Sequence, residues 1–214
     1  MRMAPLVLLS VASACTPLED RIDLFDAEWC QDISDETDPD HKGAPRNATV
    51  RCFIDGDTFD TVACEETHGP AERIRLLGPD TPEKAETNPD IVEDECYAQE
   101  SSAFIERALS GRTIRLEFDE ECVGDLGRRL AYVFITVEVD DPLREDIEQY
   151  GDLIPESDST EEVLVNEWML RAGISDLWHG YDEGRYASRL FDARERAALS
   201  GEGGWSDCDD FPNG

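Results

Sequence analysis

Three short segments combine acidic and basic side chains at spacings that suit chemistry on a phosphate group. Residues 54–58 read IDGDT, so two carboxylates lie on either side of a glycine turn. Residues 75–83 begin with an arginine and contain an aspartate and a glutamate five and eight positions later. Residues 127–132 place an arginine pair at the start of an apolar run. Each segment alone has an ordinary explanation as a turn, a cap or a strand start, so the interpretation rests on their combination.

The carboxylates of these segments predict a metal site. Asp57 and Asp80 can supply hard oxygen ligands, and Thr81 can add its backbone carbonyl. Such a site leaves positions open for water and substrate, and Ca²⁺ accepts oxygen ligands of this kind. We therefore interpret Asp57, Asp80 and Thr81 as candidate Ca²⁺ ligands.

The remaining charged residues of the segments fit catalytic roles. Glu83 lies two residues beyond the last candidate ligand and can hold or deprotonate a water molecule. Arg75 and Arg128 can clamp a phosphate with planar, bidentate donors. A metal, a carboxylate and two arginines together favour phosphodiester hydrolysis.

Composition and charge limit the alternatives. The 214 residues are 40% hydrophobic, which is enough for a packed core and excludes full disorder. The net charge of −32 argues against a protein that binds nucleic acid or anionic lipid through a broad basic surface. It does not exclude an enzyme that binds one phosphate locally through a metal and a few arginines.

The N-terminus predicts export. Residues 1–14 combine an early arginine, an apolar run and small residues, which is typical of a signal peptide, and the run is too short to span a bilayer. Cys15 follows directly, as in the lipobox of bacterial lipoproteins, so we expect membrane attachment only through a lipid at Cys15. A periplasmic or secreted protein is the other possibility. Residues 15–47 are polar and acidic and are interpreted as a tether.

The cysteines agree with an exported chain. Removing Cys15 from the seven cysteines leaves six, an even number that indicates disulfides in an oxidising compartment. Six cysteines allow fifteen pairings, and the sequence does not choose among them. No Cys-x-x-Cys spacing occurs and the three histidines are scattered, so a zinc site is not expected.

The hydrophobic pattern predicts a small α+β domain over residues 48–207, built on a barrel of five short strands with three helices. Residues 138–161 form an acidic insertion that we expect to be a solvated loop, and residues 208–214 are expected to be a tail. Alternation and helical periodicity give the following elements: strands at 50–54, 58–62, 73–77, 114–118 and 129–135, and helices at 97–109, 162–172 and 185–199.

The order and spacing of these blocks resemble the staphylococcal nuclease, or thermonuclease, family. The resemblance runs from about residue 50 to residue 205, and residues 165–167 and 205–206 add to it. It implies an OB-fold with three helices, one Ca²⁺ and hydrolysis of DNA or RNA to 3′-phosphate and 5′-hydroxyl ends. We expect a monomer with nucleic acid as its substrate.

The resemblance also implies roles for individual residues. Asp57, Asp80 and the Thr81 carbonyl correspond to the Ca²⁺ ligands. Glu83 corresponds to the general base, or to the residue that orders the attacking water. The two arginines, Arg75 and Arg128, correspond to those that bind the scissile phosphate and stabilise the five-coordinate transition state.

Several positions depart from the family. Leu126 stands where relatives usually have a tyrosine, and Asp125 stands where a basic residue is common. His179 and Tyr181 fall near two further family tyrosines, with Trp178 adjoining them. These changes affect the expected substrate affinity and base stacking and leave the catalytic set intact.

Some exported relatives carry cysteines that make Cys96–Cys122 the favoured disulfide. Cys52–Cys64, which flanks the first predicted hairpin, is the second choice and leaves Cys30–Cys208 as a terminal link.

The alternative function is a catalytically silent OB-fold module that binds nucleic acid or a protein partner. Such modules typically lose the carboxylates or arginines that this chain retains. A third interpretation keeps the hydrolytic site and assigns another phosphodiester as substrate.

Overall fold

The computed structural model describes residues 46–66, 72–119, 122, 124, 127–157 and 159–211. The expected signal segment, Cys15, most of the tether, Asp125 and Leu126 lie outside the described residues, so the predictions about them stay predictions. No helix within the described ranges is long and apolar enough to cross a membrane.

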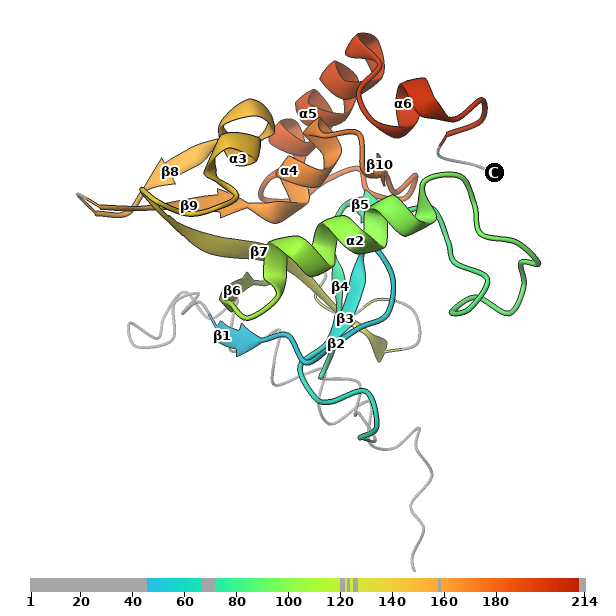
Figure 1. Ribbon diagram of the computed structural model, residues 1–214, viewed down its shortest axis with the longest axis horizontal. Coiled ribbons are helices and arrows are strands. Elements are labelled where there is room, and N and C mark those ends of the chain that lie inside the picture. Colours follow the sequence, from blue (N-terminus) through green and yellow to red (C-terminus); the bar gives the residue numbers. More distant parts are fainter. Residues whose placement is uncertain are drawn as a thin grey trace, which may run out of the picture.

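The described chain alternates short strands and helices (Figure 1). Its strands are β1 (Arg46–Thr49), β2 (Cys52–Phe53), β3 (Thr58–Asp60), β4 (Arg73–Leu76), β5 (Pro79–Asp80), β6 (Thr113–Glu117), β7 (Arg129–Glu138), β8 (Leu153–Pro155), β9 (Thr160–Leu164) and β10 (Asp176–Leu177). Its helices are α2 (Ala98–Leu109), α3 (Arg144–Tyr150), α4 (Val165–Arg171), α5 (Ala187–Ser200) and α6 (Gly204–Asp207).

The main sheet follows the order β1-β6-β7-β4-β3-β2, with the β8–β9 hairpin added beside β7. All of its pairings are antiparallel except β4–β7, which is parallel. The α+β class is therefore confirmed. The five-stranded barrel with three helices is not, because within the described residues the end strands β1 and β2 do not pair and the sheet stays open.

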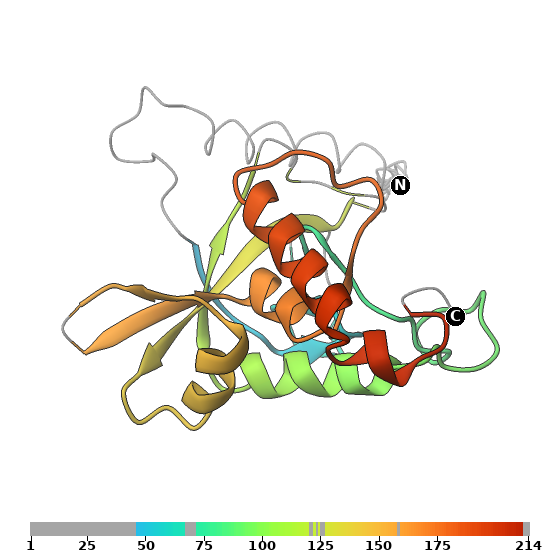
Figure 2. The ribbon, with the colours of Figure 1, turned by 90° about the horizontal axis from the view of Figure 1, so that it is seen from above.

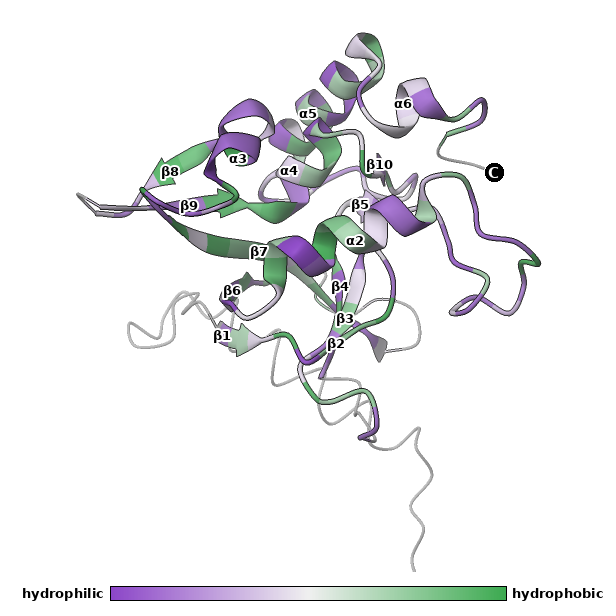
Figure 3. Ribbon diagram, viewed as in Figure 1, coloured by the Kyte–Doolittle hydropathy of each residue, from purple (hydrophilic) through white to green (hydrophobic). Residues whose placement is uncertain are grey.

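Strand β7 is the centre of the sheet, and its two faces line two hydrophobic cores. Ala131, Val133, Ile135 and Val137 pack with α2 and α4 residues, whereas the alternate positions on the other face pack towards α5. Figure 3 shows the nearly continuous hydrophobic colour of this strand. A strand buried on both faces needs an unbroken apolar run, which the sequence supplies.

Helices α2, α4 and α5 cover this sheet in layers, as the view from above shows (Figure 2). Helix α2 buries one stripe, made of Ala98, Ser101, Phe104, Ile105, Ala108 and Leu109. It ends before Gly111, whose positive φ of 72° is the left-handed conformation that glycine adopts most readily after a helix. The predicted helix at 97–109 is thus confirmed to within one residue.

Residues 138–161 are not the solvated loop that the sequence predicts. They contain α3 and β8, and the segment ends in β9, which pairs with β7. The predicted helix at 162–172 accordingly begins later, at Val165. Acidic composition hid these elements, because Glu161 and Glu162 are strand residues whose carboxylates pair with Arg144 and Arg115.

The disulfides correct the predicted pairing. Cys52–Cys64 is present as expected, but Cys96 bonds Cys208, so Cys96–Cys122 and Cys30–Cys208 are both wrong. Cys122 is also disulfide-bonded. The expected tail at 208–214 therefore begins with a residue that is covalently fixed to the start of α2.

The side chain of Asn166 links α4 to two strands. Its amide nitrogen donates to the carbonyls of Leu77 (2.9 Å) and Ala131 (3.2 Å), and its Oδ1 accepts from the Val133 amide (2.8 Å). The residue is fully buried, so no water replaces these partners if the side chain is removed.

We expect Asn166→Ala to lower the free energy of unfolding by about 3 kcal/mol, because buried backbone groups lose their partners. Denaturant unfolding measures the change. Asn88→Ala is the control, because its side chain bonds only the Asp90 amide at an exposed turn and should change stability little. Equal effects of the two substitutions would contradict this assignment.

Asp141 fixes the turn before α3. Its carboxylate accepts two bonds from Arg112, at 2.6 and 2.8 Å, and a third from the Leu143 amide at 2.9 Å. The Arg112 hydrogen bond is the largest of the causes that lower the pKa of Asp141.

A carboxylate with a lowered pKa in the folded state stabilises the fold above its unfolded pKa of about 4 and loses that contribution as the pH falls. We therefore expect Asp141→Asn to lower stability at neutral pH, and the difference from the parent to shrink below about pH 4. Unfolding curves at several pH values provide the test, and a difference that stays constant down to pH 2 would refute it.

Candidate phosphodiester-hydrolysis site

The sheet brings the predicted residues together where β3, β4 and β7 lie side by side. Thr58, next to Asp57, pairs with Arg75 across the antiparallel β3–β4 ladder. Arg75 in turn lies opposite Leu130 in the parallel β4–β7 ladder. Arg128 directly precedes β7, two residues before Leu130. Residues from three separate segments thereby lie near one another where these three neighbouring strands meet.

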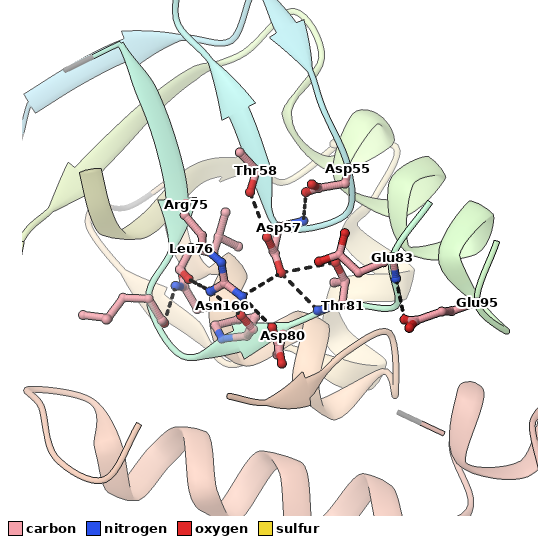
Figure 4. Close-up of polar contacts among 12 residues, drawn as sticks. Asp55, Asp57, Thr58, Arg75, Leu76, Asp80, Thr81, Glu83, Glu95 and Asn166 are labelled. Carbon is pink, nitrogen blue, oxygen red and sulfur yellow. Dashed lines mark hydrogen bonds and ion pairs between the residues drawn. The ribbon is translucent and has the colours of Figure 1, made fainter. Parts of the chain in front are cut away.

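Asp57 is the buried centre of the site (Figure 4). Its Oδ2 accepts from the Thr81 amide at 3.0 Å and from the Thr81 hydroxyl at 3.3 Å, while its Oδ1 accepts from the Thr58 hydroxyl at 2.9 Å. Its own amide donates to Asp55 Oδ1 at 3.1 Å. These bonds fix the Asp57 carboxylate against the segment that follows β5.

Arg75 joins the two predicted carboxylate ligands. Its Nη2 lies 2.5 Å from Asp80 Oδ1 and 3.3 Å from Asp57 Oδ2. Its Nη1 donates to the carbonyls of Pro79 (3.2 Å) and Leu76 (3.4 Å), which holds the guanidinium plane in place. Asp80 is itself positioned by backbone pairing with Asp176 in β10.

Negative charge exceeds positive charge among these side chains. Burial, followed by the Asp57 charge, raises the pKa of Asp55 to about 7. Burial also raises the pKa of Asp80, and burial together with the charges of Asp57 and Glu95 raises that of Glu83. Burial alone would lower the pKa of Arg75, but attraction to Asp57 and Asp80 raises it overall. The cluster is thus an environment that favours a bound cation.

The donor set suits a calcium ion rather than a transition metal. Asp57, Asp80 and the Thr81 carbonyl offer only hard oxygen atoms, which Ca²⁺ prefers. No group of three or more His, Cys, Asp or Glu side chains in the described ranges is arranged to hold a metal without further help. A cation here would therefore need the Thr81 carbonyl and water in addition to the two carboxylates.

Arg128 lines the same cavity as Arg75. This cavity of about 110 Å³ is also bounded by Gly78, Leu130 and Trp178. The structure therefore joins four of the predicted residues (Asp57, Arg75, Asp80 and Thr81) by hydrogen bonds and ion pairs. It brings Glu83 within range of the Asp57 and Asp80 charges and places Arg128 in the same cavity as Arg75.

A second cavity of about 450 Å³ adjoins the first, and both are lined by Leu77 and Trp178. Tyr181 lines it as well, but the Tyr181 hydroxyl is 2.9 Å from the Tyr132 hydroxyl in the interior. His179 is exposed and forms a ring contact with Trp178 at 5.7 Å. Of these three side chains near the positions of the family tyrosines, Trp178 is the one that borders both cavities.

Neither Glu95 nor the Ser101 hydroxyl has a role that was predicted from the sequence. Glu95 accepts from the Glu83 amide at 2.7 Å, and Ser101 donates to the Ile174 carbonyl at 2.7 Å. Glu95 is one of several acidic residues in its loop, and nothing in their spacing distinguishes it from the others. Ser101 fits the apolar face of the predicted helix and shows no sign of another role. Only the folded chain identifies their contacts.

The family model described as "Staphylococcal nuclease homologue" matches residues 73–207, more than half of the chain. The chain belongs to this family. The matched range contains Arg75, Asp80, Thr81, Glu83 and Arg128, whereas Asp57 precedes it.

Two curated relatives are similar over part of this length. The thermonuclease of Staphylococcus intermedius is 37% identical over 86 residues, and that of Staphylococcus hyicus is 35% identical over 86 residues. Each alignment covers 40% of this chain and 47% of the relative. The chain thus matches about half of the length of these relatives.

Gly56 makes the close approach between the Asp57 turn and the segment after β5 possible. A Cβ atom at Gly56 would lie 2.7 Å from the Ser101 Cβ and 2.8 Å from the Thr81 Oγ1, which is closer than atoms can pack. The Thr81 contact with Asp57 therefore depends on glycine at this position.

We expect Gly56→Ala to lower the free energy of unfolding by about 1–3 kcal/mol, because Thr81 and Ser101 must move apart to admit the methyl group. Thermal and denaturant unfolding measure the loss. An unchanged midpoint would show that the turn relaxes without disturbing its neighbours and would refute the steric argument.

Proposed function

We propose that the protein is a Ca²⁺-dependent nuclease that hydrolyses phosphodiester bonds of DNA or RNA and leaves 3′-phosphate and 5′-hydroxyl ends. The observation that carries the proposal is the convergence of Asp57, Arg75, Asp80 and Glu83 in one site that adjoins Arg128. Membership of the nuclease family and the two thermonuclease relatives support the same activity.

The arginines would bind the substrate phosphate. Arg75 already has one guanidinium nitrogen fixed to backbone carbonyls, so its orientation is set before substrate arrives. Arg128 lines the same cavity and would supply the second guanidinium of the clamp. Two planar cations aimed at one phosphate stabilise the extra negative charge of the five-coordinate transition state.

Glu83 would order the attacking water or accept its proton. Burial, followed by the Asp57 charge, raises the pKa of Glu83, and a carboxylate with a raised pKa is a stronger base. Asp57, Asp80 and the Thr81 carbonyl would hold Ca²⁺, which supplies Lewis-acid polarisation of the phosphoryl oxygen when bound. Arg75 would keep its Nη1 on the backbone carbonyls, and the phosphate would compete with Asp80 for the hydrogen bonds of its Nη2.

Export is part of the proposal. Cys52–Cys64 and Cys96–Cys208 support an oxidising location such as the periplasm or the cell exterior, where disulfides persist. Attachment through a lipid at Cys15 and a monomeric state remain predictions from the sequence.

The decisive experiment follows cleavage of DNA and RNA with Ca²⁺ or with a chelator, for the parent protein, Glu83→Gln and Arg128→Ala. We expect Ca²⁺-dependent cleavage to 3′-phosphate ends, lowered about 10²–10⁴-fold in Glu83→Gln and about 10²–10³-fold in Arg128→Ala. Calorimetry adds a readout separate from activity, because Asp57→Asn should weaken Ca²⁺ binding.

Matched controls come from exposed positions away from the site. Glu86→Gln changes a carboxylate three residues beyond Glu83, and Arg196→Ala removes an exposed arginine of α5. Both should leave cleavage within about twofold of the parent, since neither contacts the site. A folded parent protein that cleaves neither substrate in Ca²⁺ would overturn the proposal and favour the silent binding module.

A further inference from the structure

The segment between β5 and α2 is a long loop closed at its base by hydrogen bonds to Glu83. The Glu83 amide donates to Glu95 Oε2 at 2.7 Å, and the Glu95 amide donates back to the Glu83 carbonyl at 3.0 Å. Both backbone groups of Glu83 are thereby held by one residue twelve positions later, and Figure 4 shows the bond of the Glu83 amide to the Glu95 carboxylate. A second contact lies further out, where the Ala85 amide donates to Asp94 Oδ1 at 2.9 Å.

The far side of this base is tied to the C-terminal segment. Cys96, directly after Glu95, is bonded to Cys208, and the Tyr97 ring makes an edge contact with Phe211 at 6.1 Å. Figures 1 and 2 both show α6 and the chain after it beside this loop. Glu95 is therefore the sequence neighbour of a disulfide that joins residues 112 positions apart.

The first turn of α2 completes the support. The Ser101 amide donates to the Tyr97 carbonyl at 3.0 Å, and the Ser101 hydroxyl donates to the Ile174 carbonyl at 2.7 Å. The start of the helix, two residues after Cys96, is thus fixed to the segment after α4.

We propose that Glu95 is a positioning residue for Glu83, with the Cys96–Cys208 bond as its anchor. Glu83 lies on a loop, and a loop residue holds a reacting water at a fixed distance only if its backbone is held too. Glu95 performs this with its carboxylate, which accepts from the Glu83 amide, and with its amide, which donates to the Glu83 carbonyl. The expected effect of Glu95 on catalysis rests on the proposed nuclease function. Its effect on the Glu83 backbone rests on the hydrogen bonds alone.

The test compares Glu95→Ala, Glu95→Gln and Asp94→Ala in Ca²⁺-dependent cleavage. Glu95→Ala should lower kcat about 10–100-fold with KM changed less than about twofold, because the Glu83 amide loses its acceptor. Glu95→Gln keeps an oxygen acceptor and should restore kcat to within about threefold of the parent. Asp94→Ala removes the outer contact of the same loop and should leave kcat within about twofold.

The anchor is tested by paired substitutions. Cys96→Ser with Cys208→Ser should lower kcat in the same way as Glu95→Ala, whereas Cys52→Ser with Cys64→Ser should not. Each pair is assayed below its own unfolding temperature, because a link that closes 112 residues stabilises the fold more than one that closes 12. If the first pair fails to fold, the three single substitutions at Glu95 and Asp94 still decide the proposal.

Amide hydrogen exchange at Glu83 gives a readout that does not need activity. The Glu83 amide should be protected in the parent and in Glu95→Gln, and should exchange at least about tenfold faster in Glu95→Ala, which corresponds to the loss of one hydrogen bond. An inactive parent with this exchange pattern would refute the nuclease function and keep the positioning role. An active parent whose Glu95→Ala variant retains normal kcat and normal protection would refute the positioning role alone.

Discussion

The site depends on the contact of the Asp57 carboxylate with Thr81 and Arg75. One oxygen of Asp57 accepts from both the amide and the hydroxyl of Thr81 and lies 3.3 Å from Arg75. This single oxygen therefore joins the turn before β3, strand β4 and the segment after β5. A buried carboxylate without partners is costly, so each of these segments has one favourable position relative to the others. Glycine at position 56 is a consequence, because no side chain fits between the turn and Thr81.

The parallel pairing of β4 with β7 is the second constraint, because it places Arg75 beside the start of β7, which Arg128 directly precedes. Parallel neighbours need a long connection, and here that connection contains α2 and β6. The connection also carries Glu83 and Glu95 at its beginning. The strand order that places the arginines therefore requires the long connection that contains the loop between β5 and α2. Hydrogen bonds between Glu83 and Glu95 close this loop at its base. Asn166 reinforces the same region from α4 by bonding the carbonyls of Leu77 and Ala131.

Local patterns in the sequence were sufficient for several elements and for grouping the residues of the candidate site, but not for every element. The apolar run of β7 and the helical stripe of α2 predict their own structures, and charged residues at fixed spacings predict the convergence around Asp57. Contacts between residues far apart in the sequence could not be predicted from these local patterns. The Cys96–Cys208 bond and the Glu83–Glu95 contacts depend on how distant segments fold back, and six cysteines give no preference by themselves. The β8–β9 hairpin was missed because its arginine partners, Arg144 and Arg115, lie elsewhere in the chain.

The net charge of −32 restricts how such a site can act on a polyanion. Several arginines of the described chain are already paired with carboxylates, as Arg73 is with Asp60 and Arg112 with Asp141. Long-range attraction of a nucleic acid therefore does not come from the surface as a whole. If the protein is the nuclease proposed above, recognition would rely on short-range contacts at the cavity shared by Arg75 and Arg128. A divalent cation bound beside Arg75 would concentrate positive charge at that point, so the same cation would serve both substrate binding and hydrolysis. Catalysis without the cation would then be limited by binding as well as by chemistry.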